Sequence, residues 1–301
     1  MKKEPIPILS LSEKDKKFFE ETFELTAILK PQHTSFHINR LEDVVNHLKF
    51  PFLPHRQTVA DFLFITKGKS VRNKGLDTYT FGSSQFFFLP AYQISSHESM
   101  SKNVEGFYCH FDIELFNHKS INPDFINALP FLQFNGNPVV EVSNQSKQHI
   151  VQLLNRMEQE YNAHEKWNSN LLAANLLALF TEVNQFYKSG ITTENAAARI
   201  TQQYKSQLSL HIYERKTVAE YAALLSVSPN HLNKSVKAIT GKSAQELLGE
   251  MILLDAKVLL RQTSLSISEI AWKIGKEDPS DFIRFFKTKT GLTPTEYRKI
   301  D

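Results

Sequence analysis

The chain contains little cysteine, no long apolar run and no recognisable leader. Its 301 residues include one cysteine, Cys109, so no disulfide can form within the chain and no cysteine cluster can hold a metal. The longest uncharged stretch in the C-terminal half, 167–181, contains three asparagines and is shorter than a bilayer is thick. An apolar run near the start, 6–9, is interrupted by Pro7 and is too short for a secretory signal. These absences predict a cytoplasmic protein that does not enter the membrane.

Net charge is also small, but it is unevenly distributed. The formal net charge is +3, from 35 Lys and Arg against 32 Asp and Glu. Residues 1–189 carry 19 basic and 20 acidic side chains, whereas residues 190–301 carry 16 and 12, an excess of +4. A chain of this length favours two or three domains. The division of charge indicates that the C-terminal one is the more basic.

Proline and phenylalanine divide the chain differently. Of 12 prolines and 23 phenylalanines, 9 and 18 precede residue 140, and no proline lies between Pro138 and Pro229. In the first part, short apolar runs alternate with turn residues about every ten positions, which is typical of a β-sandwich or barrel. We predict strands over 58–66, 77–81, 85–89 and 106–112, and a further one near 35–38, whereas 14–30 has a helical pattern. This spacing predicts a jelly-roll barrel over 1–140.

Beyond Ser143 the apolar period becomes helical. One helix is predicted around 150–161, and a second carries apolar residues every three or four positions from Leu172 to Phe186. The region 141–190 therefore forms a helical connector. Its second helix has a seam that can pair with the same seam of another chain, which would give a homodimer. The seam can equally pack within the chain, against the preceding helix or the barrel.

The C-terminal region contains an internal repeat. Residues 217–222 resemble 266–271, and 229–247 resemble 279–297. Each copy begins with a Thr or Ser cap, continues with a short helix containing alanine, and after a turn places proline at the start of a second helix. This order predicts two helix-turn-helix units, at about 217–240 and 266–290, within a domain over 191–301.

The second helix of each unit has one apolar and one polar face. Leu232 and Val236 recur four positions apart, as do Phe282 and Phe286. A major groove accepts a polar face on which Asn reads adenine, Arg reads guanine and Lys reaches phosphate. The connector 244–262 has the pattern of one helix, about 28 Å long. Two units held apart by that length could enter successive major grooves, which lie roughly 34 Å apart.

The stretch 267–298 closely resembles the signature of the AraC/XylS family of bacterial transcription regulators. The residues that carry this resemblance are Ser268 to Ala271, Gly275, Asp278 to Ser280, Phe282, Arg284 to Lys287, Gly291, Pro294, Tyr297 and Arg298. The resemblance covers about 195–300. It implies a seven-helix DNA-binding domain with two helix-turn-helix units joined by a long helix, attached in many members to a cupin-like sensing and dimerisation domain. We therefore expect an α+β multidomain chain: a cupin-like (jelly-roll) β-barrel, a helical connector and an all-α DNA-binding domain.

The resemblance also implies site residues and partners. By family position the residues that read base edges are Asn230, Asn233, Lys234, Ser280, Ile283 and Arg284, and those that contact the DNA backbone are Lys237 and Lys287. The expected partner is double-stranded promoter DNA, and RNA polymerase is a second. No catalytic activity or cofactor is expected. Two residues stand out: Lys276 replaces the usual Phe after the glycine, and Asp281 is expected to cap its helix.

The N-terminal histidines leave one alternative, a cupin-type metal enzyme with an accessory nucleic-acid-binding domain. The usual histidine pair spaced by one residue and followed by a glutamate is absent, so we predict no metal site. His55 and Arg56 could clamp an anionic effector at a barrel mouth, and Phe64 and Phe88 could line an apolar pocket. A surface pair near a turn explains His55 and Arg56 better than a clamp does, and core packing explains the two rings at least as well as a pocket.

Overall fold

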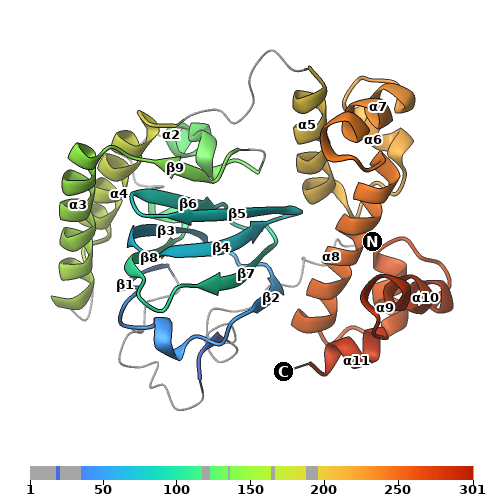
Figure 1. Cartoon of the computed structure of the whole chain (residues 1–301), viewed down its shortest axis with the longest axis horizontal. Helices are drawn as coiled ribbons and strands as arrows, with labels where there is room; N and C mark the ends of the chain where they lie inside the picture. The colour runs from blue at the N-terminus through green and yellow to red at the C-terminus, as the bar shows by residue number, and fades with distance from the viewer. Residues whose placement is uncertain are drawn as a thin grey trace. The chain divides into compact units, whose positions relative to one another are not determined.

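The computed structural model describes residues 18–20, 35–116, 123–134, 136–163, 167–187 and 196–300. They form two compact units, one within 9–190 and one from residue 191 onward. Figure 1 shows a sheet-containing unit and an all-helical unit, as the change from period-two to helical patterns predicts. Most of the helical pattern at 14–30 lies outside the described residues.

Two antiparallel sheets face each other in the first unit. One has, in spatial order, β1 (Phe36–Arg40), β8 (Glu105–Phe111), β3 (Ala60–Lys67), β6 (Gln85–Leu89) and β9 (Val139–Glu141). The other has β2 (Phe52–His55), β7 (Ser95–Met100), β4 (Lys69–Lys74) and β5 (Asp77–Gly82). Strands β1 to β8 have the sheet order of a jelly roll, β1-β8-β3-β6 facing β2-β7-β4-β5, in which only the consecutive strands β4 and β5 share a sheet. The predicted jelly-roll architecture is confirmed, with β9 added at one edge.

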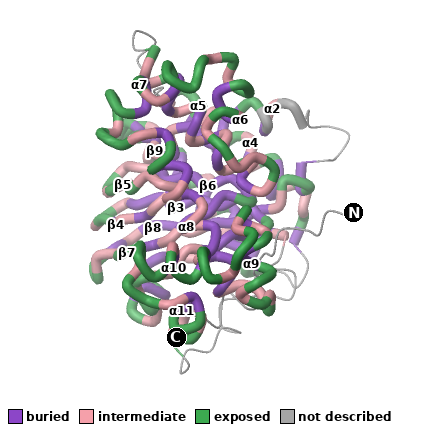
Figure 2. Tube along the Cα trace, turned by 90° about the vertical axis from the view of Figure 1, so that its right-hand side faces the viewer, coloured by how far each residue is buried: buried purple, intermediate pink, exposed green. Residues whose placement is uncertain are grey.

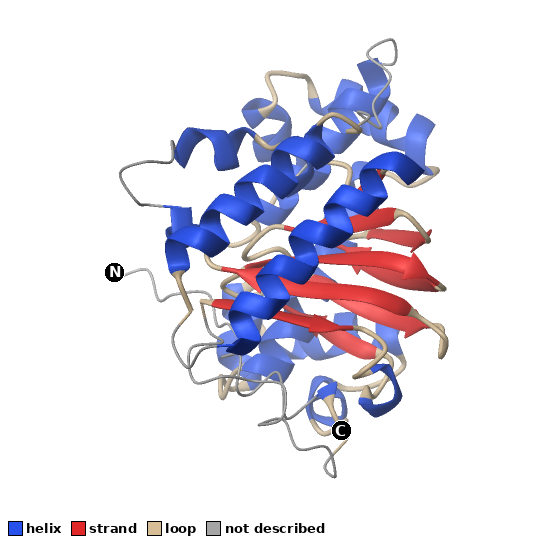
Figure 3. Ribbon diagram, turned by 90° about the vertical axis from the view of Figure 1, so that its left-hand side faces the viewer, coloured by secondary structure: helices blue, strands red, loops and turns tan. Residues whose placement is uncertain are grey.

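The five-stranded sheet buries both of its faces. On β3 and β6 the even-numbered side chains, such as Phe64 and Phe88, join a core shared with α3 (Asn144–Ala163) and α4 (Ser169–Asn184). The odd-numbered ones, such as Leu63 and Phe87, form a second core toward the four-stranded sheet. Figure 3 shows the two helices lying across the sheet. Shorter elements complete the unit: η2 (Val45–His47), η3 (Ile113–Phe116), α2 (Pro123–Ala128) and η4 (Pro130–Leu132).

The apolar seam of α4 packs within the chain. Leu172, Leu176 and Val183 are fully buried against the sheet. The Phe180 ring lies 5.3 Å, centroid to centroid, from that of Phe111 on β8. Of the two arrangements that the sequence leaves open, the intramolecular one is observed, because these side chains have no surface left to offer a second chain.

Seven helices form the described part of the C-terminal compact unit. They are α5 (Ala196–His211), α6 (Val218–Leu224), α7 (Pro229–Thr240), α8 (Ala244–Gln262), α9 (Ile267–Lys273), α10 (Pro279–Thr290) and α11 (Pro294–Arg298). The predicted connector helix and both helix-turn-helix units are therefore confirmed. Figure 1 shows α6 and α7 at one end of α8 and α9 to α11 at the other. The core around α9 and α10 contains Phe282 and Phe286, the pair predicted to face inward.

Candidate DNA-binding site

Local sequence signals start the first helix of each helix-turn-helix unit. Thr217 accepts a hydrogen bond from the backbone N–H of Glu220 at 3.3 Å, and Ser266 accepts one from Glu269 at 3.2 Å. Each glutamate carboxylate accepts a backbone N–H in return, which completes a capping box. The hydrogen bond from the Thr217 hydroxyl, with backbone N–H groups, lowers the pKa of Glu220. The same device recurs at Ser243 and Thr293, so four of these helices begin in one way.

The second helix of each unit has matching ends. Helices α7 and α10 both begin with proline and end at a glycine, Gly241 or Gly291, whose φ of 72° or 79° is left-handed. Ser228 caps α7 and Asp278 caps α10. The expectation that Asp281 caps α10 is wrong, because the cap is the residue before the proline. Asp281 lies instead in the first turn.

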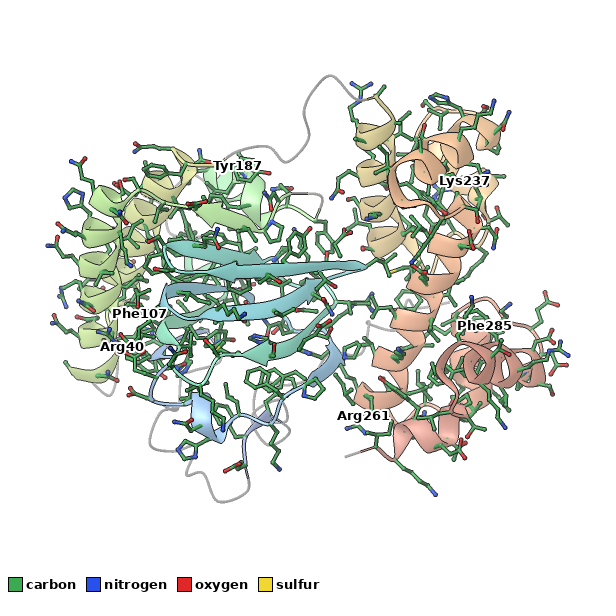
Figure 4. The ribbon with its side chains drawn as sticks, in the orientation of Figure 1. Arg40, Phe107, Tyr187, Lys237, Arg261 and Phe285 are labelled. Atoms are coloured by element: carbon green, nitrogen blue, oxygen red, sulfur yellow. The ribbon has the colours of Figure 1, made fainter. Side chains whose placement is uncertain are left out.

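The two second helices expose polar faces. On α7 the side chains of Asn230, Lys234 and Lys237 are exposed, while Leu232 and Val236 are buried. Helix α10 exposes Ser280, Ile283, Arg284 and Lys287 in the same way. Figure 2 shows exposed turns on both helices, and Figure 4 labels Lys237 on α7. Seven of the eight predicted contact residues thus lie on solvent-facing surfaces that recur in both units.

Asn233 is the exception among the eight. It is half-buried, and its Oδ1 accepts a hydrogen bond from the backbone N–H of Ala244 at 3.0 Å. Reading adenine bidentately requires both the oxygen and the nitrogen of the amide. In this structure the oxygen instead holds the first residue of α8 against α7, so the side chain supports the helix that joins the two units.

Two interactions of α10 and its turn modify the charge near its exposed polar face. The Arg284 guanidinium pairs with the Asp281 carboxylate at 2.5 Å, and both side chains are largely exposed. The Lys276 ammonium lies 5.4 Å from the centroid of the Phe285 ring, which Figure 4 labels. Lys276, which stands where the AraC/XylS pattern has phenylalanine, thus makes a cation–π contact within its own unit. The Arg284 guanidinium is therefore held by a carboxylate of its own helix in this structure.

The predicted ligand residues of the N-terminal unit lie in buried positions. His55 and Arg56 are 4% and 2% exposed, so they are not the surface pair that was the alternative to an anion clamp. Phe64 and Phe88 are fully buried and face the helices α3 and α4, on the side of the sheet away from the jelly-roll interior. Strand alternation places these two rings on the face of the sheet that the helices cover, not in the space between the sheets.

A buried polar cluster that the sequence analysis missed lies between the sheets. Arg72 on β4 donates two hydrogen bonds to Asp61 on β3, at 2.6 and 2.9 Å, and one to Ser95 on β7. Burial opposes the Arg72 charge, but the charge and hydrogen bonds of Asp61 together outweigh it and raise the pKa of Arg72. Gln57 also donates a hydrogen bond to Asp61. The pair fixes the two sheets together, since removing one partner would leave a buried charge.

A second buried cation, Lys74, lies at the end of β4. The Lys74 ammonium donates to the carbonyls of Gln133 and Gly136 at 2.7 and 2.8 Å. Burial lowers the pKa of Lys74 to about 7.

Among the described ranges, no group of three or more His, Cys, Asp or Glu side chains could hold a metal ion. None of the described helices is long and apolar enough to cross a membrane.

Comparison with known proteins agrees with this geometry. Residues 221–300 match a family of helix-turn-helix domains. The transcriptional activator RhaS of Enterobacter sp. strain 638 is 29% identical over 160 residues, which is 52% of this chain and 56% of the relative. The bifunctional transcriptional activator and DNA repair enzyme AdaA of Bacillus subtilis is 33% identical over 87 residues, 29% of this chain and 41% of the relative. The alignments thus span about half of these relatives' length.

Among solved structures, ToxT of Vibrio cholerae O395 is similar over most of both chains. It is 18% identical, covers 88% of this chain and 97% of its own, and has a TM-score of 0.40.

Proposed function

We propose that this chain, whose C-terminal domain is a double helix-turn-helix of the AraC type, regulates transcription by binding promoter DNA through α7 and α10. The observation that supports this most strongly is the repeated geometry. Two helices with the same proline start and glycine end lie in two units joined by the 19-residue helix α8, and each exposes a polar face. That helix is about 28 Å long, close to the roughly 34 Å between successive major grooves on one side of the duplex.

Different roles follow for the exposed side chains. Asn230, Lys234, Ser280 and Arg284 would meet base edges, and Ile283, which is 39% exposed, offers an apolar contact of the kind that thymine methyl groups accept. Lys237 and Lys287 lie farther along their helices and would contact phosphates. Asn233 would act indirectly, by holding α8 in place through Ala244.

Gel shifts test the proposal. The full chain is used to select duplexes from a random pool, and its affinity is then measured on a selected duplex and on a scrambled one across a salt series. We expect roughly 10³-fold or greater preference for the selected duplex. No preference would leave an architectural DNA-binding protein, and no binding would contradict the proposal altogether.

The N-terminal unit would carry the regulatory input. The family resemblance implies a small effector bound by the jelly roll, whose interior is polar around the buried Asp61 and Arg72 pair. Regulation of transcription would bring the chain to RNA polymerase and place it in the compartment that contains the DNA, the cytoplasm of a bacterium. A homodimer would have to use a surface other than the buried seam of α4.

The metal-enzyme alternative predicts metal in the purified chain. Elemental analysis of the purified full chain discriminates the two, because stoichiometric zinc or iron would favour an enzyme and its absence from a DNA-binding preparation would favour the regulator. No feature of the described residues favours the enzyme.

A further inference from the structure

The two helix-turn-helix units are joined by a second connection besides α8. The segment 212–216, between α5 and α6, reaches the C-terminal end of α9. There the Lys216 ammonium donates a hydrogen bond to the carbonyl oxygen of Ile212 at 3.0 Å and another to that of Lys273, also at 3.0 Å. One side chain thus ties the entrance of the first unit to the last residue of the first helix of the second unit.

Packing reinforces this connection. A Cβ atom at position 275 would lie 2.7 Å from Cδ of Lys216, so the lysine stem passes over a glycine that has no side chain to obstruct it. Gly275 has a φ of 82°, which also favours glycine. Tyr213 packs against the core of the second unit, and the Lys273 ammonium lies 5.5 Å from the centroid of its ring. The contact therefore combines hydrogen bonds, apolar packing and a cation–π interaction.

The connection is not a requirement of the helix-turn-helix itself. In the internal repeat, Ser266 corresponds to Thr217, so Leu265 corresponds to Lys216. Leu265 packs within the second unit. Half-burying an ammonium has a cost that leucine avoids, and burial does lower the pKa of Lys216, although Asp255 and Glu220 oppose this. The cost of burying the Lys216 ammonium is offset by its hydrogen bonds to carbonyls at helix C-terminal ends, where a cation is favoured.

We propose that Lys216 locks the two units in one relative orientation and so makes the chain selective for the spacing between its two DNA half-sites. This inference rests on the proposed function. Moving one half-site by a single base pair rotates its groove by about 34° and shifts it by about 3.4 Å. Units joined by α8 alone could follow by bending the helix, whereas units clamped at Lys216 cannot.

Distances between spin labels test the lock without DNA. Labels are introduced in the full chain through Ala238→Cys on α7 and Lys289→Cys on α10, both exposed positions, while the natural Cys109 is fully buried and stays unlabelled. Double electron–electron resonance should give one narrow distance distribution. Lys216→Met keeps the stem and removes the ammonium, and it should broaden that distribution. A distribution equally narrow in Lys216→Met, or already broad with Lys216 present, would overturn the proposal.

Lys257→Met is the matched control. Lys257 is also half-buried with a pKa lowered by burial, but its ammonium lies 5.9 Å from the centroid of the Tyr297 ring, within the second unit. It should leave the label distances narrow, and broadening in this variant too would show that any lysine loss loosens the domain, which counts against a lock at Lys216.

Spacing selectivity is then measured on DNA. A selected duplex is lengthened or shortened by one base pair between its half-sites. The unsubstituted chain should lose roughly 10-fold in affinity, as for a mismatched site, whereas Lys216→Met should lose less than about 3-fold. Equal losses in both would overturn the spacing role. Failure to select any duplex would instead contradict the proposed function, and the label distances would still decide whether the lock exists.

Discussion

Arg284 and Lys287 lie on the same exposed face of α10, one helical turn apart, yet they are expected to do different work. Arg284→Ala should cost about 1 to 3 kcal/mol of binding free energy on a selected duplex and relax the preference at one base pair. Lys287→Ala should weaken selected and scrambled duplexes alike and reduce the salt dependence. Gel shifts over a salt series, with single base-pair variants, check both. Equal and salt-insensitive losses would contradict this division of roles.

Lys74 makes stability depend on pH. Its pKa is about 7 in the folded chain and 10.5 for an ordinary lysine. Between these values the unfolded chain holds a proton that the folded chain releases, so the free energy of unfolding rises with pH, by at most about 1.4 kcal/mol per unit. Lys74→Met should remove this rise. Urea unfolding from pH 7 to 10 measures it.

The control for Lys74 lies on the same strand. Lys69 begins β4 and is exposed, so Lys69→Met should keep the pH dependence of the unsubstituted chain. If Lys74→Met also keeps it, the buried ammonium is not its source.

At the scale of the element, the capping boxes set where four of the C-terminal helices begin. Removing a cap hydroxyl with Ser266→Ala should lower the free energy of unfolding by about 1 kcal/mol, because the first-turn N–H loses its acceptor. Ser268→Ala, an exposed change inside the same helix, should have little effect. Thermal or urea unfolding of the full chain followed through the helical signal checks the pair. Similar losses in both would mean that the cap is not the cause.

The same caps predict acid sensitivity. Hydrogen bonds lower the pKa of Glu220, Glu246, Glu269 and Glu296 below the ordinary 4.5. A lowered folded-state pKa gives stability that is present above the ordinary value and is lost as the pH falls through the folded one. Helical signal measured between pH 6 and 3 should therefore fall less steeply when Glu269→Gln removes one of these groups.

An element can be predicted from the sequence when the residues that define it are its own neighbours in the chain, and not when they are distant in sequence. The C-terminal helices were predictable almost to the residue, because caps, prolines and glycines mark their ends locally: α8 spans Ala244–Gln262, as its apolar pattern predicts. The four-stranded sheet was only partly predictable. Strands β4 and β7 read KSVRNK and SSHESM, and their inward residues are polar because Asp61, neighbouring hydroxyls and, for Lys74, backbone carbonyls satisfy them. No periodicity in hydrophobicity reveals such a partner.

The candidate site shows the same division. Exposed positions on α7 and α10 follow from helical spacing alone. The occupied oxygen of Asn233 and the bridge made by Lys216 do not, since each depends on a residue distant in sequence, Ala244 or Lys273. For Phe64 and Phe88 the sequence left both a pocket and core packing open, because alternation gives two faces without saying which of them the helices cover.

At the scale of the whole molecule, the small net charge predicts a shallow salt dependence. Lys234, Lys237, Arg284 and Lys287 are the basic side chains on the two proposed reading faces. If Lys237 and Lys287 neutralise phosphates as proposed, the slope of log affinity against log salt should be about −2 for one chain and about −4 for two. Fluorescence anisotropy with a labelled selected duplex measures the slope. A slope near zero would contradict phosphate contact at these positions.

The aromatic face of the five-stranded sheet also bears on how the chain is made. The helices that cover this face lie far along the chain from its strands. His37 on β1 forms a hydrogen bond with Tyr161 on α3, 124 positions later, and Phe62 packs against Phe180 on α4. A chain emerging from the ribosome exposes this face until α4 has been synthesised, and long-range strand pairing is slow. The C-terminal helices, with local start and stop signals, can form as they appear. The N-terminal unit is therefore where nascent chains would need protection from aggregation, although its finished core is the more extensively packed of the two.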